Sequence, residues 1–286
     1  MTANNTPNKS NQRVKVAAVQ MASGPNVAAN LNEAGRHIKH AAEAGARLVV
    51  LPENFSIMGM KEQDKVKIRE ADGQGPVQDF LAEQSEMHGV WLVGGTVPMV
   101  ADDPNKVRAA CLMYDDKGQR RARYDKTHLF DVHLVDSKEN YVESETIEPG
   151  DDIVVVDTPF ARVGLTICYD LRFPELFRGM VDQGVDVIVI PSAFTAITGK
   201  AHWEALIRAR AVENLSYVVA ADQGGYHVNG RESHGHSMIV DPWGHILDRL
   251  ANGSGYVIAE LDLDYLKSTR RNFPALDHRR LNCKVS

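Results

Sequence analysis

One stretch of this sequence, Ala161–Glu175 (ARVGLTICYDLRFPE), constrains the fold more than any other. Its apolar run, Val163–Ile167, is typical of a buried strand and leads directly into Cys168, after which a polar turn and a helix are predicted. A side chain at such a junction is held rigidly at a sheet edge, and the first N–H groups of a helix carry partial positive charge. Cys168 is therefore either a nucleophile that ionises easily or simply a small buried apolar residue.

The rest of the sequence alternates between strand-like and helix-like segments. Strands are predicted at Val14–Met21, Arg47–Pro52, Val90–Val97, Val107–Tyr114, Arg120–Tyr124, Asp152–Val156, Arg162–Ile167, Val185–Ile190, Tyr217–Ala221, Ser237–Val240, His245–Leu250 and Gly255–Leu263. Helices are predicted at Asn26–Ala46, Pro76–His88, Glu175–Gln183, His202–Asn214 and Asp264–Arg271. Lys126–Gly150 lacks periodicity and is predicted to be a long loop. Hairpins mixed with crossovers indicate an α/β protein with mixed sheets.

Composition and charge exclude several classes of protein. A chain that is 43% hydrophobic and 24% charged is typical of a globular protein. A net charge of −6 without a basic cluster argues against nucleic acid and an anionic membrane as partners. The apolar runs are too short to span a bilayer. Residues 1–13 are polar and predict a disordered lead-in, followed by one domain over residues 14–286.

The three cysteines, Cys111, Cys168 and Cys283, are widely spaced and form no CxxC pair. This pattern favours neither a disulfide framework nor a zinc site, and it fits a reducing, cytoplasmic compartment. Cys111 falls in the middle of a predicted strand and Cys283 in a tail, so neither has a base nearby in the sequence. Cys168 remains the candidate nucleophile.

Three reactive side chains follow three different predicted strands. Glu53 comes after RLVVLP, Lys126 after the second strand of a hairpin, and Cys168 after its own strand. Strand ends can converge on one edge of an α/β sheet, where such folds place their sites. Glu53 can take the thiol proton if burial raises its pKa, and Lys126 can stabilise the oxyanion formed by attack. The alternative is that Glu53 and Lys126 are solvated surface charges.

Three motifs in this order resemble the nitrilase, or carbon–nitrogen hydrolase, superfamily: LPENF at Leu51–Phe55, YDKTHLFDV at Tyr124–Val132 and ICYDLRFPE at Ile167–Glu175. The resemblance extends from about Val14 to about Arg280.

This resemblance implies a four-layer α-β-β-α sandwich with mixed sheets. It also implies Glu53 as general base, Lys126 as stabiliser of the intermediate and Cys168 as nucleophile, without a cofactor or metal. The second glutamate of the family is placed on Glu143, with Glu145 as the alternative. Members of the superfamily commonly form homodimers or larger homo-oligomers.

Longer sequence matches indicate which branch of the superfamily the chain resembles. CYDLRFPE, PSAFTAITGKAHWEALIRARAVEN and GHSMIVDPWG resemble amidases that act on deaminated glutathione, a small 2-oxo-acid amide. True nitrilases usually have Trp-Glu after the nucleophile, where this chain has Tyr169-Asp170. The resemblance therefore implies an amide substrate hydrolysed through a thioester. The alternatives on the same fold are an omega-amidase acting on 2-oxoglutaramate, an N-carbamoyl amidohydrolase and a nitrilase.

The substrate-binding candidates are Tyr169, Arg172, Thr195, Thr198 and His202. Arg172 is placed to bind an anionic substrate, although an ion pair with Asp170 or Glu175 would explain it equally well. The two threonines and His202 follow the predicted strand Val185–Ile190, at the sheet edge proposed for Cys168, although Ser192–Thr198 could be only a structural loop.

Three histidines, His227, His234 and His236, lie in the Gly-rich segment GGYHVNGRESHGH. A metal amidohydrolase would need three or four converging ligands, and HxH in such a loop is a weak signal for one. The segment is interpreted as a loop near the site mouth or at a subunit contact. A catalytically silent binding module is the other remote alternative.

Overall fold

The computed structural model describes residues 13–133 and 140–281. The predicted lead-in lies outside this range except for Arg13, which already belongs to the first strand, and Cys283 also lies outside it. Within the described residues the strands form two large mixed sheets and two small hairpins.

The first large sheet has seven strands among the described residues, in the order β17-β1-β2-β3-β5-β4, with β6 also paired to β5. Their bounds are β1 Arg13–Gln20, β2 Leu48–Val50, β3 Trp91–Val93, β4 Val97–Val100, β5 Val107–Tyr114, β6 Arg120–Asp125 and β17 Gly255–Asp262. The parallel strands β1, β2 and β3 form its centre, and antiparallel strands complete it on both sides.

The second large sheet has six strands in the described part of the chain, in the order β16-β15-β12-β11-β10-β9. Their bounds are β9 Val155–Asp157, β10 Arg162–Leu165, β11 Val187–Ser192, β12 Tyr217–Asp222, β15 Met238–Val240 and β16 Ile246–Arg249. It repeats the plan of the first sheet, because parallel strands β10, β11 and β12 are again flanked by antiparallel ones.

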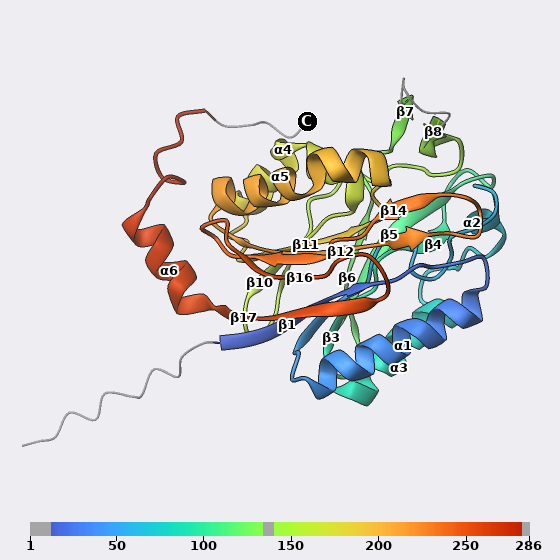
Figure 1. Cartoon of the computed structure of the whole chain (residues 1–286), viewed down its shortest axis with the longest axis horizontal. Coiled ribbons are helices and arrows are strands. Elements are labelled where there is room, and N and C mark those ends of the chain that lie inside the picture. Colours follow the sequence, from blue (N-terminus) through green and yellow to red (C-terminus); the bar gives the residue numbers. More distant parts are fainter. Residues whose placement is uncertain (1–12, 134–139, 282–286) are drawn as a thin grey trace, which may run out of the picture.

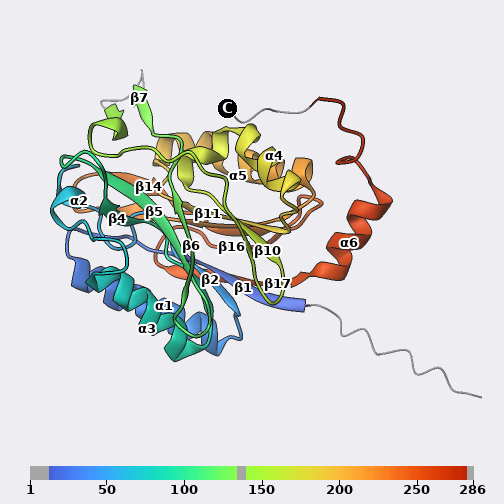
Figure 2. The ribbon, with the colours of Figure 1, turned by 180° about the vertical axis from the view of Figure 1, so that it is seen from behind.

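Helices cover the outer face of each sheet (Figures 1 and 2). The helices are α1 Val27–Glu43, α2 Asp64–Lys67, α3 Pro76–His88, α4 Pro174–Asp182, α5 Ala196–Asn214 and α6 Leu263–Asn272. Both views place α1 and α3 against the first sheet and α4 and α5 against the second, with the sheets between them. The predicted four-layer α-β-β-α sandwich is therefore confirmed.

Alternation along the strands buries both faces of each large sheet. On β1, Val16 and Ala18 belong to a cluster that extends through the second sheet to α4 and α5, whereas Ala17 and Val19 belong to the cluster under α1 and α3. Successive side chains of a strand point to opposite faces, so a strand buried on both faces reads as a continuous apolar run. This is why RLVVLP and VIVI gave a strand signal without alternation in the sequence.

One predicted strand, Val90–Val97, is wrong in extent, because it is broken into β3 and β4 at Gly94–Thr96. At Gly95, where φ is +46°, an added Cβ would lie 2.0 Å from the carbonyl oxygen of Pro52. Only glycine allows this close approach. The break therefore brings the segment between β3 and β4 against the turn that carries Glu53.

Two other predictions need correction. Helix α5 begins at Ala196 rather than His202, with Thr195 as its N-cap, so Ser192–Thr198 is not simply a loop. The described part of Lys126–Gly150 contains a hairpin of β7 Asp131–His133 and β8 Asn140–Val142, followed by the short 3₁₀ helix η1 at Glu143–Glu145. The second small hairpin is β13 Gly224–Tyr226 with β14 Glu232–His234.

Candidate active site

Cys168 is held in a sharp turn between β10 and α4. It is the first residue of the 3₁₀ helix η2, Cys168–Arg172, and its φ of +46° is unusual for a residue with a side chain. The predicted polar turn is thus a 3₁₀ helix, and the α-helix begins only at Pro174. Positive φ at a non-glycine residue stores strain, which the surrounding contacts must hold.

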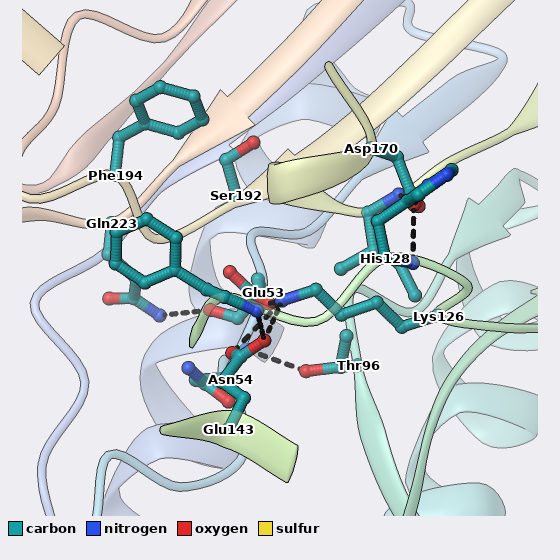
Figure 3. A network of polar contacts seen from close by, with 12 residues as sticks. Glu53, Asn54, Thr96, Lys126, His128, Glu143, Asp170, Ser192, Phe194 and Gln223 are labelled. Carbon is teal, nitrogen blue, oxygen red and sulfur yellow. Dashed lines mark hydrogen bonds and ion pairs between the residues drawn. The ribbon is translucent and has the colours of Figure 1, made fainter. Parts of the chain in front are cut away.

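Asp170 supplies those contacts. Its buried carboxylate accepts hydrogen bonds from the backbone N–H of Ile167 at 2.9 Å and the hydroxyl of Tyr124 at 2.7 Å. The backbone N–H of His128 donates at 3.1 Å, and the His128 ring Nδ1 lies 2.7 Å away (Figure 3). Because Tyr124 and His128 flank Lys126 in sequence, Asp170 connects the turn that carries Cys168 to the segment that carries Lys126.

Glu53 follows β2 in a turn that both sheets help to hold. The backbone N–H of Asn54 donates to Thr96 Oγ1 at 2.8 Å, which fixes the turn to the first sheet. The side-chain amide of Gln223, directly after β12 of the second sheet, donates to the carbonyl of Glu53 at 2.9 Å. Figure 3 shows both contacts beside the Glu53 side chain.

Lys126 lies at the end of β6 with its side chain fully buried. Its Nζ is 2.8 Å from Glu53 Oε1 and 2.7 Å from Glu143 Oε2, so one ammonium bridges two carboxylates (Figure 3). The backbone N–H of Phe130 donates to the same Glu143 oxygen at 2.8 Å. Glu143, rather than the exposed Glu145, is therefore the second glutamate that lies against the lysine.

Burial and charge set the protonation of this group. Burial raises the pKa of Glu53, and the charge of Lys126 only partly opposes this. Burial alone would lower the pKa of Lys126, but Glu143 and Glu53 outweigh it and raise that pKa well above its usual value. Burial and the charge of Glu53 raise the pKa of the Cys168 thiol. The thiol of Cys168 is therefore harder to ionise than in water, and the Glu53 carboxylate is a stronger base.

Cys168, Glu53 and Glu143 line one pocket. Of the predicted substrate-binding residues, Tyr169, Arg172, Thr195 and Thr198 also line it, whereas His202 does not. His202 instead contacts Arg172 from outside, with its Nδ1 3.2 Å from the guanidinium Nη1. The hydroxyls of Thr195 and Thr198 lie 2.9 Å apart at the start of α5. Thr195 also caps that helix, because its hydroxyl accepts a hydrogen bond from the Thr198 backbone N–H at 3.2 Å.

The predicted alternative for Arg172, an ion pair with Asp170 or Glu175, is wrong. Within residues 13–133 and 140–281 no carboxylate lies within ion-pair distance of Arg172, and Asp170 is occupied by Tyr124 and His128. The Arg172 guanidinium carbon lies 5.3 Å from the centre of the Phe194 ring and 5.8 Å from that of Tyr169. Arg172 thus presents an uncompensated positive charge at the pocket.

Comparison with known proteins decides the family. The model of the carbon–nitrogen hydrolase family matches residues 15–271. The chain belongs to the carbon–nitrogen hydrolase family. It is a hydrolase of the amidase type, and the resemblance stated from its three motifs is confirmed.

Two relatives of this hydrolase carry the same functional name. It is 43% identical over 266 residues to a Synechocystis protein called deaminated glutathione amidase, covering 92% of this chain and 97% of that protein. It is 38% identical over 269 residues to the human protein of the same name, covering 93% of this chain and 82% of that protein.

Two solved structures share the fold of this carbon–nitrogen hydrolase. The Saccharomyces cerevisiae protein Nit3, a member of branch 10 of the nitrilase superfamily, superposes with a TM-score of 0.84 at 32% identity, covering 94% of this chain and 97% of that one. The Caenorhabditis elegans NitFhit protein gives 0.86 at 38% identity, covering 94% of this chain and 65% of that one.

The histidine segment of the hydrolase is tied into the structure through its own contacts. His227 lies 2.9 Å from the carbonyl of Ser23 and 2.8 Å from the hydroxyl of Ser233. His234 and His236 stack on each other with ring centres 4.4 Å apart, and burial lowers the pKa of His234 to about 4. In the described part of the chain no three His, Cys, Asp or Glu side chains are grouped as a metal site.

Several residues that line the pocket were not predicted from the sequence: Asn54, Met58, Phe130, Tyr141, Ala193, Phe194, Arg231, Glu232 and Ser233. Most come from loops and from the two small hairpins, where no periodicity predicts which side chain faces inward. Asn54 and Ala193 carried a detectable signal, because each follows a predicted strand near a residue already chosen. No described helix of this hydrolase is long and apolar enough to cross a membrane.

Proposed function

We propose that Cys168, Glu53, Lys126 and Glu143 form the catalytic machinery of a cofactor-free cysteine amidase. The observation that carries this proposal is the Lys126 ammonium held between two carboxylates, 2.8 Å from Glu53 and 2.7 Å from Glu143. Both carboxylates line the pocket that Cys168 also lines, and Lys126 lies buried behind them. A nucleophile, a base and a fixed cation then surround one position for a carbonyl group.

In the first half-reaction the Cys168 sulfur attacks the amide carbon while Glu53 accepts the thiol proton. A C–S bond forms, and the oxyanion is stabilised by Lys126 and by the backbone N–H that follows Cys168. The intermediate collapses with cleavage of the C–N bond, and Glu53 returns the proton to the leaving amine. A thioester on Cys168 remains.

In the second half-reaction Glu53 takes a proton from water, whose oxygen attacks the thioester. The C–S bond breaks, the carboxylic acid leaves and the proton passes to the cysteine sulfur. One base serves both steps, which requires a carboxylate more basic than an exposed glutamate. The raised pKa of Glu53 supports this role. Glu143, fixed by Phe130, orients Lys126 and the substrate amide.

The proposed substrate is the amide of a small 2-oxo acid, most specifically deaminated glutathione. The names of the relatives support it, as does Arg172, a cation at the pocket without a carboxylate partner among the described residues. The alternatives on this fold remain an omega-amidase, an N-carbamoyl amidohydrolase and a nitrilase. They differ in the leaving group or in the presence of an anionic head group.

We further propose a homo-oligomer in a reducing, cytoplasmic compartment. Trp243 and Phe273 pack edge to face with ring centres 5.4 Å apart, and each is about half exposed. Val212 of α5 is similarly exposed, so apolar surface is available for a second copy. The buried thiols of Cys111 and Cys168 are both free, which fits a reducing compartment.

Mass spectrometry of the intact protein mixed with a panel of amides tests this function. Rapid quenching is expected to trap an acyl group whose mass matches the substrate acid on the peptide that contains Cys168. The values of kcat/KM for deaminated glutathione, 2-oxoglutaramate and a simple nitrile then assign the branch. Preference for the nitrile would contradict the amidase proposal, and preference for 2-oxoglutaramate would move the protein to the omega-amidases.

A further inference from the structure

A second, smaller hollow adjoins the main pocket. Asn54, Met58 and Arg231 line both spaces, so the two share a wall next to Glu53. The remaining walls of the hollow come from the segment of residues 57–65, which follows the catalytic turn and leads into α2.

The hollow carries more positive than negative charge. Three cationic side chains line it, Lys61, Lys65 and Arg231, against a single carboxylate, Glu62. Lys65 Nζ lies 2.7 Å from Glu62, and Arg231 donates to the other oxygen of the same carboxylate. Lys61 makes no ion pair with any described residue. One carboxylate cannot neutralise three cations, which leaves an excess of two positive charges.

Two other carboxylates nearby, Asp64 and Glu232, do not line the hollow. Asp64 pairs with Lys67 at 2.7 Å and does not line the hollow. Glu232, next to Arg231 in sequence, lines the main pocket but not the hollow. The positive charge of the hollow is therefore not cancelled from its own walls.

The walls are also fixed before any ligand binds. Asn229 donates from its side-chain amide to the carbonyl of Gly59 at 2.8 Å, which links the turn between β13 and β14 to the segment before α2. The Arg231 backbone N–H donates to Asn229 Oδ1 at 3.0 Å, and its guanidinium carbon lies 5.1 Å from the centre of the Tyr141 ring. A prearranged cationic site loses little entropy when an anion binds.

We propose that this hollow is the subsite for a carboxylate carried by the leaving amine of the substrate. This inference rests on the proposed amidase function and deepens it. Deaminated glutathione has a 2-oxo acid on the acyl side of the scissile amide and a dipeptide ending in a carboxylate on the amine side. Arg172 lines the main pocket but not the hollow, so each end of the substrate meets its own cation.

The subsite separates amides that release a dipeptide from amides that release ammonia. An ammonia-releasing substrate such as 2-oxoglutaramate has nothing to place in the hollow. A dipeptide amine fills it, and the binding energy can be used to position the scissile amide over Cys168.

The test compares two substrates that differ in one group: deaminated glutathione and its C-terminal glycinamide analogue, in which the distal carboxylate is a neutral amide. The enzymes are the unchanged protein, a Lys61→Gln/Lys65→Gln double variant and Lys39→Gln as the control. Lys39 lies on α1 and pairs only loosely with Glu43, at 3.8 Å. The unchanged protein is expected to prefer the carboxylate substrate about tenfold in kcat/KM, as for a charged hydrogen bond.

In the double variant that ratio is expected to fall to near one, whereas Lys39→Gln keeps it. A ratio unaffected by the double substitution, or absent from the unchanged protein, overturns the subsite while leaving the amidase function in place. Hydrolysis of neither substrate contradicts the proposed function instead. Calorimetric binding of both compounds to Cys168→Ala then tests the subsite without turnover: equal affinity overturns it, and tighter carboxylate binding that the double substitution abolishes supports it.

Discussion

The charged side chains at the base of the pocket are paired with one another, whereas cations at its rim lack such compensation. At the base, Lys126 lies between Glu53 and Glu143, and Asp170 is satisfied by Tyr124 and His128. At the rim, Arg172 has no carboxylate partner among the described residues. In the adjoining hollow, Lys65 and Arg231 share Glu62, and Lys61 has no ion pair with a described residue. The base is a closed network of buried charges, and the rim presents cations that only a ligand can neutralise.

We expect the base to carry out the reaction and the rim to determine which substrate is preferred. Buried charges must be compensated within the protein, because an isolated charge in a low-dielectric interior is strongly destabilising. Partly exposed cations at a rim can remain uncompensated, since water solvates them until an anion arrives. Substitutions at the base should therefore reduce the rate for every substrate, whereas substitutions at the rim should change which substrate is preferred.

The largest effect is expected for Cys168→Ala, which removes the attacking atom. Hydrolysis should be lost for all amides, and circular dichroism should be unchanged, since the cysteine supplies little packing. Cys111→Ala is the matched control, because Cys111 is a free thiol buried in β5, away from the pocket lining. Substantial turnover by Cys168→Ala would falsify the thioester mechanism.

Glu53→Gln is expected to lower kcat by about 10²-fold or more, because the base acts in both half-reactions. The pH profile adds a second test. Glu53 must be deprotonated to accept the thiol proton, so kcat/KM should rise as pH increases through its pKa. Burial raises that pKa, so the acidic limb should lie above the usual pKa of 4.5 for a glutamate. A limb at or below that value contradicts the assignment.

Glu143→Gln should reduce kcat by roughly tenfold to 10²-fold, since it weakens the placement of Lys126 without removing the cation. Glu145→Gln is the control, because Glu145 lies in the same short helix but is exposed. Steady-state kinetics on both variants decides between them. Equal losses would show that the helix η1, not the Glu143 carboxylate, is what the site requires.

Arg172→Gln is expected to give the smallest loss, about tenfold in kcat/KM, expressed mainly in KM and only for substrates with an anionic head group. A neutral short-chain amide should react at a similar rate with either enzyme. This comparison tests the division between base and rim directly. A tenfold fall in kcat for the neutral amide would place Arg172 with the base instead.

The base was predictable from the sequence, whereas of the cations at the rim only Arg172 was. Glu53 and Cys168 each follow a strongly apolar strand, and Lys126 follows the second strand of a hairpin. Their convergence at strand ends could therefore be inferred, and the family motifs strengthened that inference. Glu143 lies in a segment without periodicity, and only the resemblance placed it. Lys61, Lys65 and Arg231 come from segments far apart in sequence, and their common hollow depends on loop contacts such as that of Asn229 with Gly59.

Two errors in the predicted bounds of a strand and a helix also have physical causes. The sequence WLVGGTV reads as one apolar strand, but the contact between Gly95 and Pro52 divides it. The start of α5 was placed too late because its first turns contain Thr198 and Gly199, which are weak helix formers, whereas Thr195 gives the helix a side-chain cap.

The catalytic groups are divided between the two sheets: Glu53 and Lys126 follow strands of the first, and Cys168 follows a strand of the second. Neither half of the sandwich holds a complete set. Activity should therefore require that the two sheets pack against each other, and not only that each sheet forms. On gradual addition of urea, turnover should fall before the far-UV circular dichroism does, because loosening the core that both sheets share separates the catalytic groups first. An assay of hydrolysis would then serve as a sensitive gauge of how tightly the sandwich is closed.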